Sequence, residues 1–320
     1  MYSVLIIGLG NIGMGYDLNH DPDKYILSHA RAFQKHPKFK LIAGVDVDID
    51  RRELFESHYG CPAFTTVSEA LKKSKADVIV VSNPTKQHIR ALQEIIEFGL
   101  PRAVLCEKPI AFDVKQADEI TTIFKKRGCE FYVNYMRRSD VGVHELYERI
   151  HSENIITPVK GNVWYTNGLF NNASHFINLL EYLFGKVEKS IVLDSGKRSI
   201  CSDPEPDFQL SFEKGKFNFV ALPGNSFSHN VLEIIASNGR IRYENGGEKI
   251  TWEAIESNKL FPGHVTLSLE KEVLPSDYRR IQWHVVDQLS VSMDGGSARI
   301  CNGDDALGTL YVLDDIENQL

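Results

Sequence analysis

A glycine-rich turn directly after an apolar run constrains this chain more than any other feature of its sequence. Residues 4–7 have the composition of a buried β-strand, and the residues after them follow a G-x-G-x-x-G arrangement. The first glycine permits a tight turn, the second lets the backbone approach a ligand, and the third lets the next segment pack closely on the strand. Amides at the start of a helix also attract anions. The turn therefore predicts a binding site for the pyrophosphate of a dinucleotide, formed by Gly8, Gly10, Asn11, Ile12 and Gly13.

An acidic residue follows the next strand-like segment. Residues 41–45 have the pattern of a buried strand that stops at Asp46, whose carboxylate can accept hydrogen bonds from the hydroxyls of an adenine ribose. The same carboxylate would repel a 2′-phosphate, which favours NAD as the cofactor. Arg51 and Arg52 leave NADP possible, although the exposed face of the following helix explains both of them better.

The spacing between the glycine turn and Asp46 is longer than usual, because residues 14–27 form a polar segment before an expected helix at 28–36. Long loops beside a ligand site often form a wall of that site. An exposed surface loop without ligand contact explains the segment equally well.

Composition limits the class of protein. A chain of 320 residues is long enough for two domains, and its net charge of −7 with no long run of Lys or Arg argues against nucleic-acid binding. The five cysteines contain no C-x-x-C pair, which indicates neither a disulfide framework nor a zinc site. We expect no metal. The cysteine pattern fits a reducing cytosol, and no apolar run reaches the length of a signal-peptide core or a membrane span, so we expect a cytoplasmic protein.

Strand and helix patterns alternate over the first part of the chain. Apolar runs at 77–81, 103–106 and 131–133 are separated by helical segments, which predicts a doubly wound parallel sheet of the Rossmann type, an α/β fold. We expect this dinucleotide-binding domain to cover residues 1–138.

Beyond position 158 the pattern changes to longer alternating strands with turn residues between them. They predict an α+β domain over 139–302, with an open, mostly antiparallel sheet that helices cover on one face. The other face would meet a second copy in a homodimer or homotetramer. Residues 303–320 are expected to form a helix that packs back on the first domain. The expected strands are 160–166, 189–194, 207–212, 216–222, 230–236, 240–243 and 264–269.

Polar residues also follow the third long strand of the first domain. Asn83 and Pro84 open a helix whose first turn contains His88. Since ligands bind at the carboxyl edge of open α/β sheets, these residues are candidates for cofactor contact. An exposed helix histidine is the alternative for His88.

A charged pair ends the next strand, where Glu107 and Lys108 precede Pro109. Ordinary surface charge is the usual explanation of such a pair, but its position at the ligand edge makes it a candidate site. Arg138 comes after the following strand, at the same edge, and is a candidate for substrate contact.

In the second domain, a helix expected at 174–184 is preceded by Asn171 and Asn172, whose amides suit the recognition of hydroxyl groups. Trp164 and Tyr165 could present flat faces to a sugar ring, or could be strand residues that pack the core.

Three motifs together resemble the Gfo/Idh/MocA (glucose-fructose oxidoreductase, inositol dehydrogenase and rhizopine-catabolism) family over essentially the whole chain. They are the N-terminal glycine turn, the Glu107-Lys108-Pro109 triplet, and His175 at the start of a helix that ends in Leu-Phe-Gly at 183–185. The resemblance implies a two-domain oxidoreductase in which Lys108 and His175 line the cleft beside the nicotinamide. It also implies that Glu107, Lys108 and the segment from Asn83 to His88 contact the cofactor.

The resemblance implies hydride transfer between the nicotinamide and a carbinol carbon of a sugar, polyol or nucleotide sugar. Imidazole is neutral or charged near pH 7, so His175 is expected to be the general acid or base, and Lys108 to hold the reacting oxygen; these roles could be exchanged. Asn171 departs from the family pattern, which commonly has aspartate there. An amide cannot take a proton, which weakens a mechanism based on a triad. The alternative is a non-catalytic NAD(P)-binding sensor or regulator with the same fold.

Overall fold

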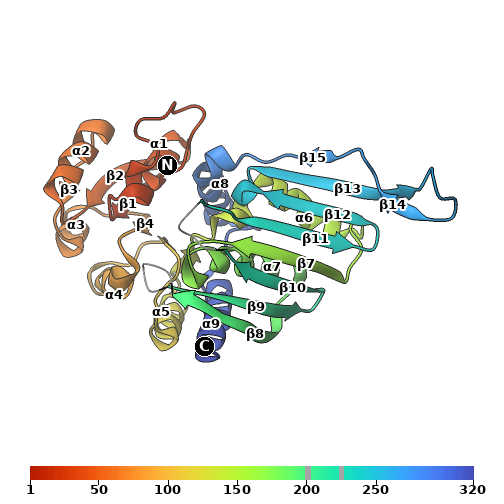
Figure 1. Cartoon of the computed structure of the whole chain (residues 1–320). Helices are drawn as coiled ribbons and strands as arrows, with labels where there is room; N and C mark the ends of the chain where they lie inside the picture. Colours follow the sequence, from red (N-terminus) through yellow and green to blue (C-terminus); the bar gives the residue numbers. More distant parts are fainter. Residues whose placement is uncertain (199–202, 223–226) are drawn as a thin grey trace. The chain divides into compact units, whose positions relative to one another are not determined.

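Two units, each with its own β-sheet, make up the chain (Figure 1). The computed structural model describes residues 1–198, 203–222 and 227–320. The first unit contains residues 1–139 and 279–307, and the second contains 140–278 and 308–320.

The first unit is built on six parallel strands in the order β3-β2-β1-β4-β5-β6, the doubly wound sheet that the sequence predicts. Strands β1, β4 and β5 run through the middle of the sheet and are almost wholly buried and apolar, as expected for strands covered on both faces. The strands are β1 (Tyr2–Ile7), β2 (Phe39–Val45), β3 (Ala63–Phe64), β4 (Val78–Val81), β5 (Ala103–Cys106) and β6 (Glu130–Val133).

Helices cover both faces of this sheet. Helices α1, α2 and α8 share one apolar core with β1 and β4, while α3, α4 and α5 lie side by side on the opposite face. Side-chain oxygens of Ser28, Asp48, Thr66 and Asp113 cap the first turns of α1, α2, α3 and α5. The helices are α1 (His29–Lys35), α2 (Ile49–Tyr59), α3 (Val67–Lys73), α4 (His88–Phe98), α5 (Val114–Lys126) and α8 (Ile281–Met293).

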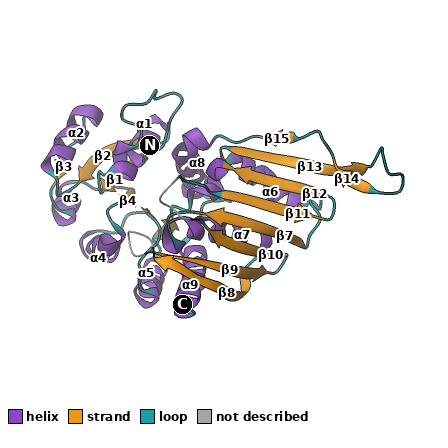
Figure 2. Cartoon of the chain, viewed as in Figure 1, coloured by secondary structure: helices purple, strands orange, loops and turns teal. Residues whose placement is uncertain are grey.

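The second unit contains a nine-stranded sheet that is antiparallel except between β7 and β10, which confirms the expected α+β class (Figure 2). Buried and more exposed residues alternate along β7 and β9 because one face of the sheet packs on helices. The strands are β7 (Val159–Tyr165), β8 (Val187–Arg198), β9 (Pro204–Phe212), β10 (Gly215–Ala221), β11 (Val231–Ala236), β12 (Gly239–Glu244), β13 (Lys249–Ser257), β14 (Val265–Leu267) and β15 (Glu272–Leu274). The sequence patterns did not predict β13 and β15.

Helices α6 (Val141–His151) and α7 (Ser174–Phe184) cover the inner face of this sheet, and the C-terminal part of α9 (Gly303–Asn318) belongs to the same unit. Thr309 of α9 accepts a hydrogen bond from Asn178 and donates one to Glu181, both on α7.

The division of the chain differs from the expected boundaries at 138 and 302. Residues 279–302 belong to the first unit because Val285, Val286 and Leu289 of α8 are buried in the core that contains α1. Residues 308–320 belong to the second unit, whereas we expected the whole segment 303–320 to pack on the first domain. Helix α8 begins at Ile281.

Candidate functional site

A cleft of about 650 Å³ lies at the carboxyl ends of the strands of the first unit. It contains every residue predicted to bind the cofactor except Gly13, which is buried beneath the turn. The residues predicted from the sequence that line it are Gly8, Gly10, Asn11, Ile12, Asp46, Asn83, Pro84, His88, Glu107 and Lys108.

The three glycines of the turn have different surroundings. Gly8 has a φ of +94°, and a Cβ there would lie 2.4 Å from the backbone nitrogen of Asn83. A Cβ on Gly13 would lie 2.1 Å from the carbonyl oxygen of Gly8. At Gly10, by contrast, the nearest atom to a Cβ is Nη1 of Arg51 at 3.7 Å, so this backbone faces the open cleft. Gly8 and Gly13 thus allow the turn to pack. Gly10 leaves a space into which an anion such as a pyrophosphate fits.

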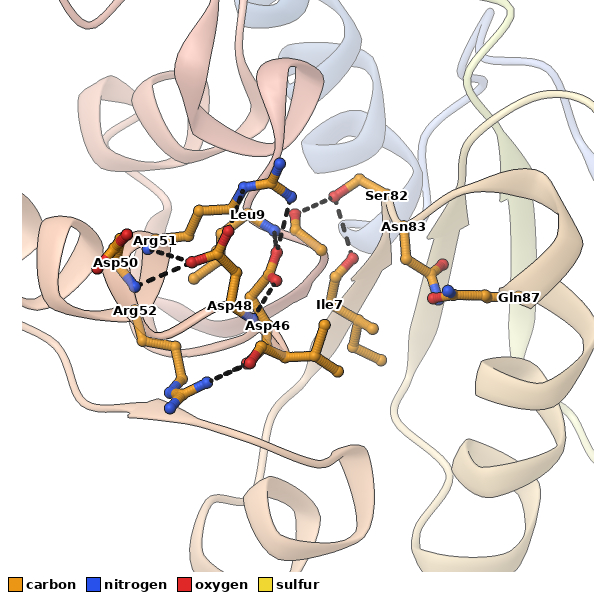
Figure 3. A network of polar contacts seen from close by, with 12 residues as sticks. Ile7, Leu9, Asp46, Asp48, Asp50, Arg51, Arg52, Ser82, Asn83 and Gln87 are labelled. Atoms are coloured by element: carbon orange, nitrogen blue, oxygen red, sulfur yellow. Dashed lines mark hydrogen bonds and ion pairs between the residues drawn. The ribbon is translucent and has the colours of Figure 1, made fainter.

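Ser82, which the sequence analysis missed, supports the turn from β4. Its hydroxyl lies 2.8 Å from the carbonyl oxygen of Gly8 and 3.1 Å from that of Ile7 (Figure 3). The hydroxyl therefore stabilises the turn from below. Its position directly after a predicted strand was a signal that could have identified it.

The carboxylate of Asp46 is fixed at the end of β2 (Figure 3). Its Oδ2 accepts a hydrogen bond from the backbone N–H of Leu9, and its Oδ1 accepts one from the N–H of Asp48. Arg51 lies 3.6 Å from Oδ2 and lines the cleft. Arg52 instead donates to the carbonyl oxygen of Asp46 and does not line the cleft. The two arginines therefore have different surroundings, and of the two only Arg51 lies at the cleft beside the Asp46 carboxylate.

His88 is placed differently from the prediction. Its side chain is 1% exposed, with Nδ1 2.9 Å from the carbonyl oxygen of Pro109 and Nε2 2.8 Å from that of Asn83. Burial lowers the pKa of His88, against the opposing effect of these carbonyls and of Glu107. Both ring nitrogens contact protein carbonyls while His88 still lines the cleft, so direct cofactor contact stays a prediction, and the alternative of an exposed helix histidine is wrong.

Asn83 lines the cleft with a side-chain oxygen that is available for a ligand. Its Oδ1 is buried and has no hydrogen-bond partner within the described ranges, whereas Nδ2 lies 3.4 Å from Oε1 of Gln87. Buried polar atoms are nearly always bonded. The unsatisfied acceptor therefore fits a hydroxyl or amide donor from a bound dinucleotide.

Glu107 belongs to a buried polar group that the sequence did not reveal. Its Oε1 lies 2.8 Å from Nε2 of His29 and 2.6 Å from Nδ2 of Asn134, and Asn134 also donates to Gln282 of α8. Burial alone would raise the pKa of Glu107, but the bonds from His29 and Asn134 and the charge of Lys108 lower it. Glu107 is therefore a carboxylate at neutral pH, directly before Lys108 in the chain.

The inserted segment after the glycine turn is held by two buried charges. Asp17 accepts hydrogen bonds from the backbone of residues 27 and 28, and Arg31 of α1 donates to the carbonyl oxygens of residues 18, 20 and 25. Tyr16 lines the cleft. The start of this segment thus forms part of the cleft wall, and the remainder has an internal structure of its own.

Arg138, a predicted substrate residue, is buried and lies 2.9 Å from the carboxylate of Asp305. It does not line the cleft of the first unit. This ion pair links the end of β6 to the start of α9.

In the second unit, His175 is 7% exposed and lies in the first turn of α7. Asn171 and Asn172 precede it in a short π-helix, and Asn172 donates to the carbonyl oxygen of Thr166. The carboxylate of Asp203, which the sequence analysis missed, accepts a hydrogen bond from the backbone N–H of Asn171.

Tyr165 lies in the core of the second unit. It is 0% exposed, its ring contacts Phe208 edge-on, and its hydroxyl donates to the carbonyl oxygen of Pro206. The prediction that Tyr165 meets substrate is therefore wrong, and the alternative of a core strand residue is correct. Trp164 points to the other face of the sheet and is 39% exposed.

Within the described ranges, no group of three or more His, Cys, Asp or Glu side chains is placed to hold a metal ion. No helix among these residues has the length and apolar character needed to span a membrane.

Comparison with known proteins gives a family match for the first part of the chain. Residues 2–135 match the model of an oxidoreductase family with an NAD-binding Rossmann fold, the GFO_IDH_MocA family. An inositol 2-dehydrogenase from Saccharopolyspora erythraea is 27% identical over 137 residues, which are 42% of this chain. That match spans only 40% of the length of the relative.

Solved structures resemble the chain over almost its full length. A WlbA dehydrogenase from Bordetella pertussis, in complex with NADH and UDP-GlcNAcA, has a TM-score of 0.77 at 18% identity and covers 99% of this chain and 95% of its own. A putative myo-inositol dehydrogenase from Sinorhizobium meliloti has a TM-score of 0.73 at 16% identity and covers 100% of this chain and 97% of its own. At these identities the likeness shows the fold.

Proposed function

Because residues 2–135 match the NAD-binding Rossmann domain of the GFO_IDH_MocA oxidoreductase family, we propose that the chain is a dehydrogenase or reductase of carbohydrate CH–OH groups. The substrate would be a sugar, a polyol or a nucleotide sugar. The observation that carries this proposal is the cleft of the first unit, where Gly10, Asp46 and Lys108 lie around one cavity.

The residues of the cleft fit a dinucleotide. Gly10 leaves room for a pyrophosphate, Asp46 retains lone pairs for ribose hydroxyls, and Asn83 offers an unsatisfied oxygen. NAD supplies a nicotinamide ring that accepts or donates a hydride. The carboxylate of Asp46 favours NAD, and Arg51 beside it leaves NADP possible as a second cofactor.

Lys108 and His175 are the proposed catalytic residues. Lys108 is half-buried at the cleft and next to an ionised Glu107, so its ammonium can hold and polarise a substrate oxygen. His175 can take up or release the hydroxyl proton near neutral pH. Asn171 and Asn172 would bind substrate hydroxyls, while Asn171 cannot take a proton in place of the family's aspartate.

The test is a turnover screen of the purified chain with NAD and NADP against sugars, polyols and nucleotide sugars. We expect turnover that Lys108→Met lowers by a factor of roughly 10² to 10³. His175→Asn is expected to lower kcat and to flatten the neutral-pH limb of its pH profile. Cofactor binding without turnover of any of these substrates would favour the alternative function, a non-catalytic NAD(P)-binding sensor or regulator.

We also propose a homodimer or homotetramer formed through the open face of the nine-stranded sheet. Asn162, Asn218 and Gln209 form a row of hydrogen-bonded amides across three strands of this face, and Trp164 is exposed beside it. Tryptophan is among the residues that are enriched in protein–protein interfaces. A cytoplasmic location is proposed from the cysteine pattern alone.

A further inference from the structure

Lys108 is flanked in the chain by two residues that are each held by a buried histidine. Glu107, before it, accepts a hydrogen bond from Nε2 of His29 at 2.8 Å. Pro109, after it, has its carbonyl oxygen 2.9 Å from Nδ1 of His88. Both histidines belong to the first unit, on α1 and α4 respectively.

We propose that His29 and His88 are positioning residues that fix Lys108 from its two sides. This inference rests on the proposed function, because it assumes that the direction of the Lys108 ammonium matters for the reaction. Neither histidine needs to touch the substrate, because each acts on Lys108 through a neighbour in the chain.

The contact of His29 fixes the direction of the Glu107 side chain. His29 is 0% exposed, and the partner oxygen Oε1 also accepts from Asn134 at 2.6 Å. Two donors on one carboxylate oxygen leave the side chain a single favourable rotamer. The backbone that continues into Lys108 is consequently held at the ligand edge of β5.

The contacts of His88 join two parts of the cleft wall. Nε2 lies 2.8 Å from the carbonyl oxygen of Asn83, at the end of β4, and Nδ1 reaches Pro109, beyond the end of β5. The ring therefore spans the gap between the loop that offers Oδ1 of Asn83 and the loop that presents Lys108. A neutral imidazole has one N–H, so the ring donates to one of these two carbonyl oxygens and packs against the other. The ring thereby restrains the spacing of a proposed cofactor contact relative to the proposed catalytic amine.

One charged group, Glu107, acts on the rings of both His29 and His88. Glu107 is the charge with the largest influence on His88, and Arg90 and Glu94 of the same helix line the cleft with Lys108. Glu107 is also the bonded partner of His29. The carboxylate therefore links both histidines, one by a hydrogen bond and the other by its charge.

The experiment measures Lys108 directly, without requiring turnover. The full chain is reductively methylated with formaldehyde, and the extent of labelling at Lys108 relative to exposed Lys86 is followed by peptide mass spectrometry. Leucine variants of His29 and His88 replace the imidazole by an apolar side chain of similar size and so remove the N–H donors. Glutamine variants of both keep an N–H donor.

We expect each leucine variant to change the Lys108-to-Lys86 labelling ratio by at least about threefold, and each glutamine variant to return it to within about twofold of the parent. Where a substrate is turned over, kcat should fall roughly tenfold in the leucine variants with the KM for substrate nearly unchanged. If a leucine variant does not fold, phenylalanine replaces it, since its ring is also flat, although larger, and has no donor.

His36 supplies the matched control. It is also buried, lies at the C-terminal end of α1, the helix that begins at His29, and contacts Asp287 instead of a neighbour of Lys108. His36→Leu should lower thermal stability and leave the labelling ratio unchanged. The inference is overturned if His36→Leu shifts the ratio as much as the other leucine variants, or if glutamine and leucine act alike at positions 29 and 88. A chain without turnover would refute the proposed function, while the labelling ratio still decides the positioning role.

Discussion

The carboxylate of Asp46 accepts a hydrogen bond from the backbone N–H of Leu9, with Oδ2 2.8 Å from the nitrogen. Leu9 lies between the first two glycines of the turn, so the bond joins the predicted pyrophosphate site to the predicted ribose site. Asp48 donates to the other oxygen. The orientation of the carboxylate is therefore set by the protein before a ligand binds.

Asp46→Asn should weaken NADH binding and reduce the preference of the protein for NADH over NADPH. One oxygen becomes an NH₂ group that cannot accept from both backbone donors, and the negative charge that repels a 2′-phosphate is lost. We expect the Kd for NADH to rise about tenfold, and the ratio of NADPH to NADH affinity to rise by a similar factor. Fluorescence titration of both reduced cofactors measures these changes.

Asp50→Asn is the control for charge alone. Asp50 is an exposed acid on α2, the helix that follows Asp46, and does not line the cleft. Its substitution should leave both affinities within about twofold. Equal effects at positions 46 and 50 would contradict a specific role for Asp46.

Alanine at Gly8 and at Gly10 should separate folding from cofactor binding. Gly8→Ala places a Cβ 2.4 Å from a backbone nitrogen at a φ of +94°, so we expect a loss of roughly 1–3 kcal/mol or more of stability. Gly10 has a φ of −74° and faces the cleft, so Gly10→Ala should change stability by less than about 1 kcal/mol. Its NADH affinity should still fall by at least about tenfold.

Thermal unfolding by circular dichroism and NADH titration measure both quantities on both variants. A Gly10→Ala protein that binds NADH normally would show that the second glycine of the turn is not at the pyrophosphate. A Gly8→Ala protein of unchanged stability would contradict the packing of the turn against β4.

The local part of this site could be predicted because the rules that govern it are local. A glycine turn after a strand and an acid after the next strand are set by backbone geometry within a few residues. His29, in contrast, lies 78 residues from Glu107, and the inserted segment separates it from the glycine turn, so no spacing rule pointed to it. His88 was identified, but which atoms its ring contacts depends on where the Pro109 carbonyl lies in space.

The error at Tyr165 had a signal that the sequence contained. Lys160, Asn162 and Trp164 alternate with smaller or apolar residues along β7, so position 165 falls on the inward face. Helix α8 carries no such signal. Its apolar residues would fit either unit, and only the complete core shows that Val285 packs with the first.

Asp77→Asn should destabilise the protein at neutral pH and have little effect in acid. The Asp77 carboxylate accepts from the backbone N–H and the hydroxyl of Ser3, at 2.8 and 2.7 Å, and these bonds hold its pKa below the usual 3.8. A carboxyl with a lowered folded-state pKa stabilises the fold fully above its unfolded-state pKa, and this stabilisation is lost as the pH falls through the lower value.

We therefore expect Asp77→Asn to cost about 1–2 kcal/mol at pH 7, with the difference from the parent shrinking below about pH 3.8. Thermal unfolding at both pH values measures it. Asp118→Asn, at an exposed position of α5, is the control and should have no effect at either pH. A difference that grows in acid would contradict the sign of the shift.

Asn218→Arg should separate the subunits of the proposed oligomer. Asn218 is the centre of the amide row: its Oδ1 accepts from Gln209 and its Nδ2 donates to Asn162, at 2.7 and 3.0 Å. In a twofold interface each copy would contribute the same arginine, so the substitution places two like charges on one buried surface. Light scattering after size exclusion should give the mass of 36.2 kDa for the variant and a multiple of it for the parent.

Lys186→Glu, on the exposed turn before β8, is the control and should leave the parent mass unchanged. A parent chain that is already monomeric, or an Asn218→Arg variant with the parent's mass, would exclude this face as the interface.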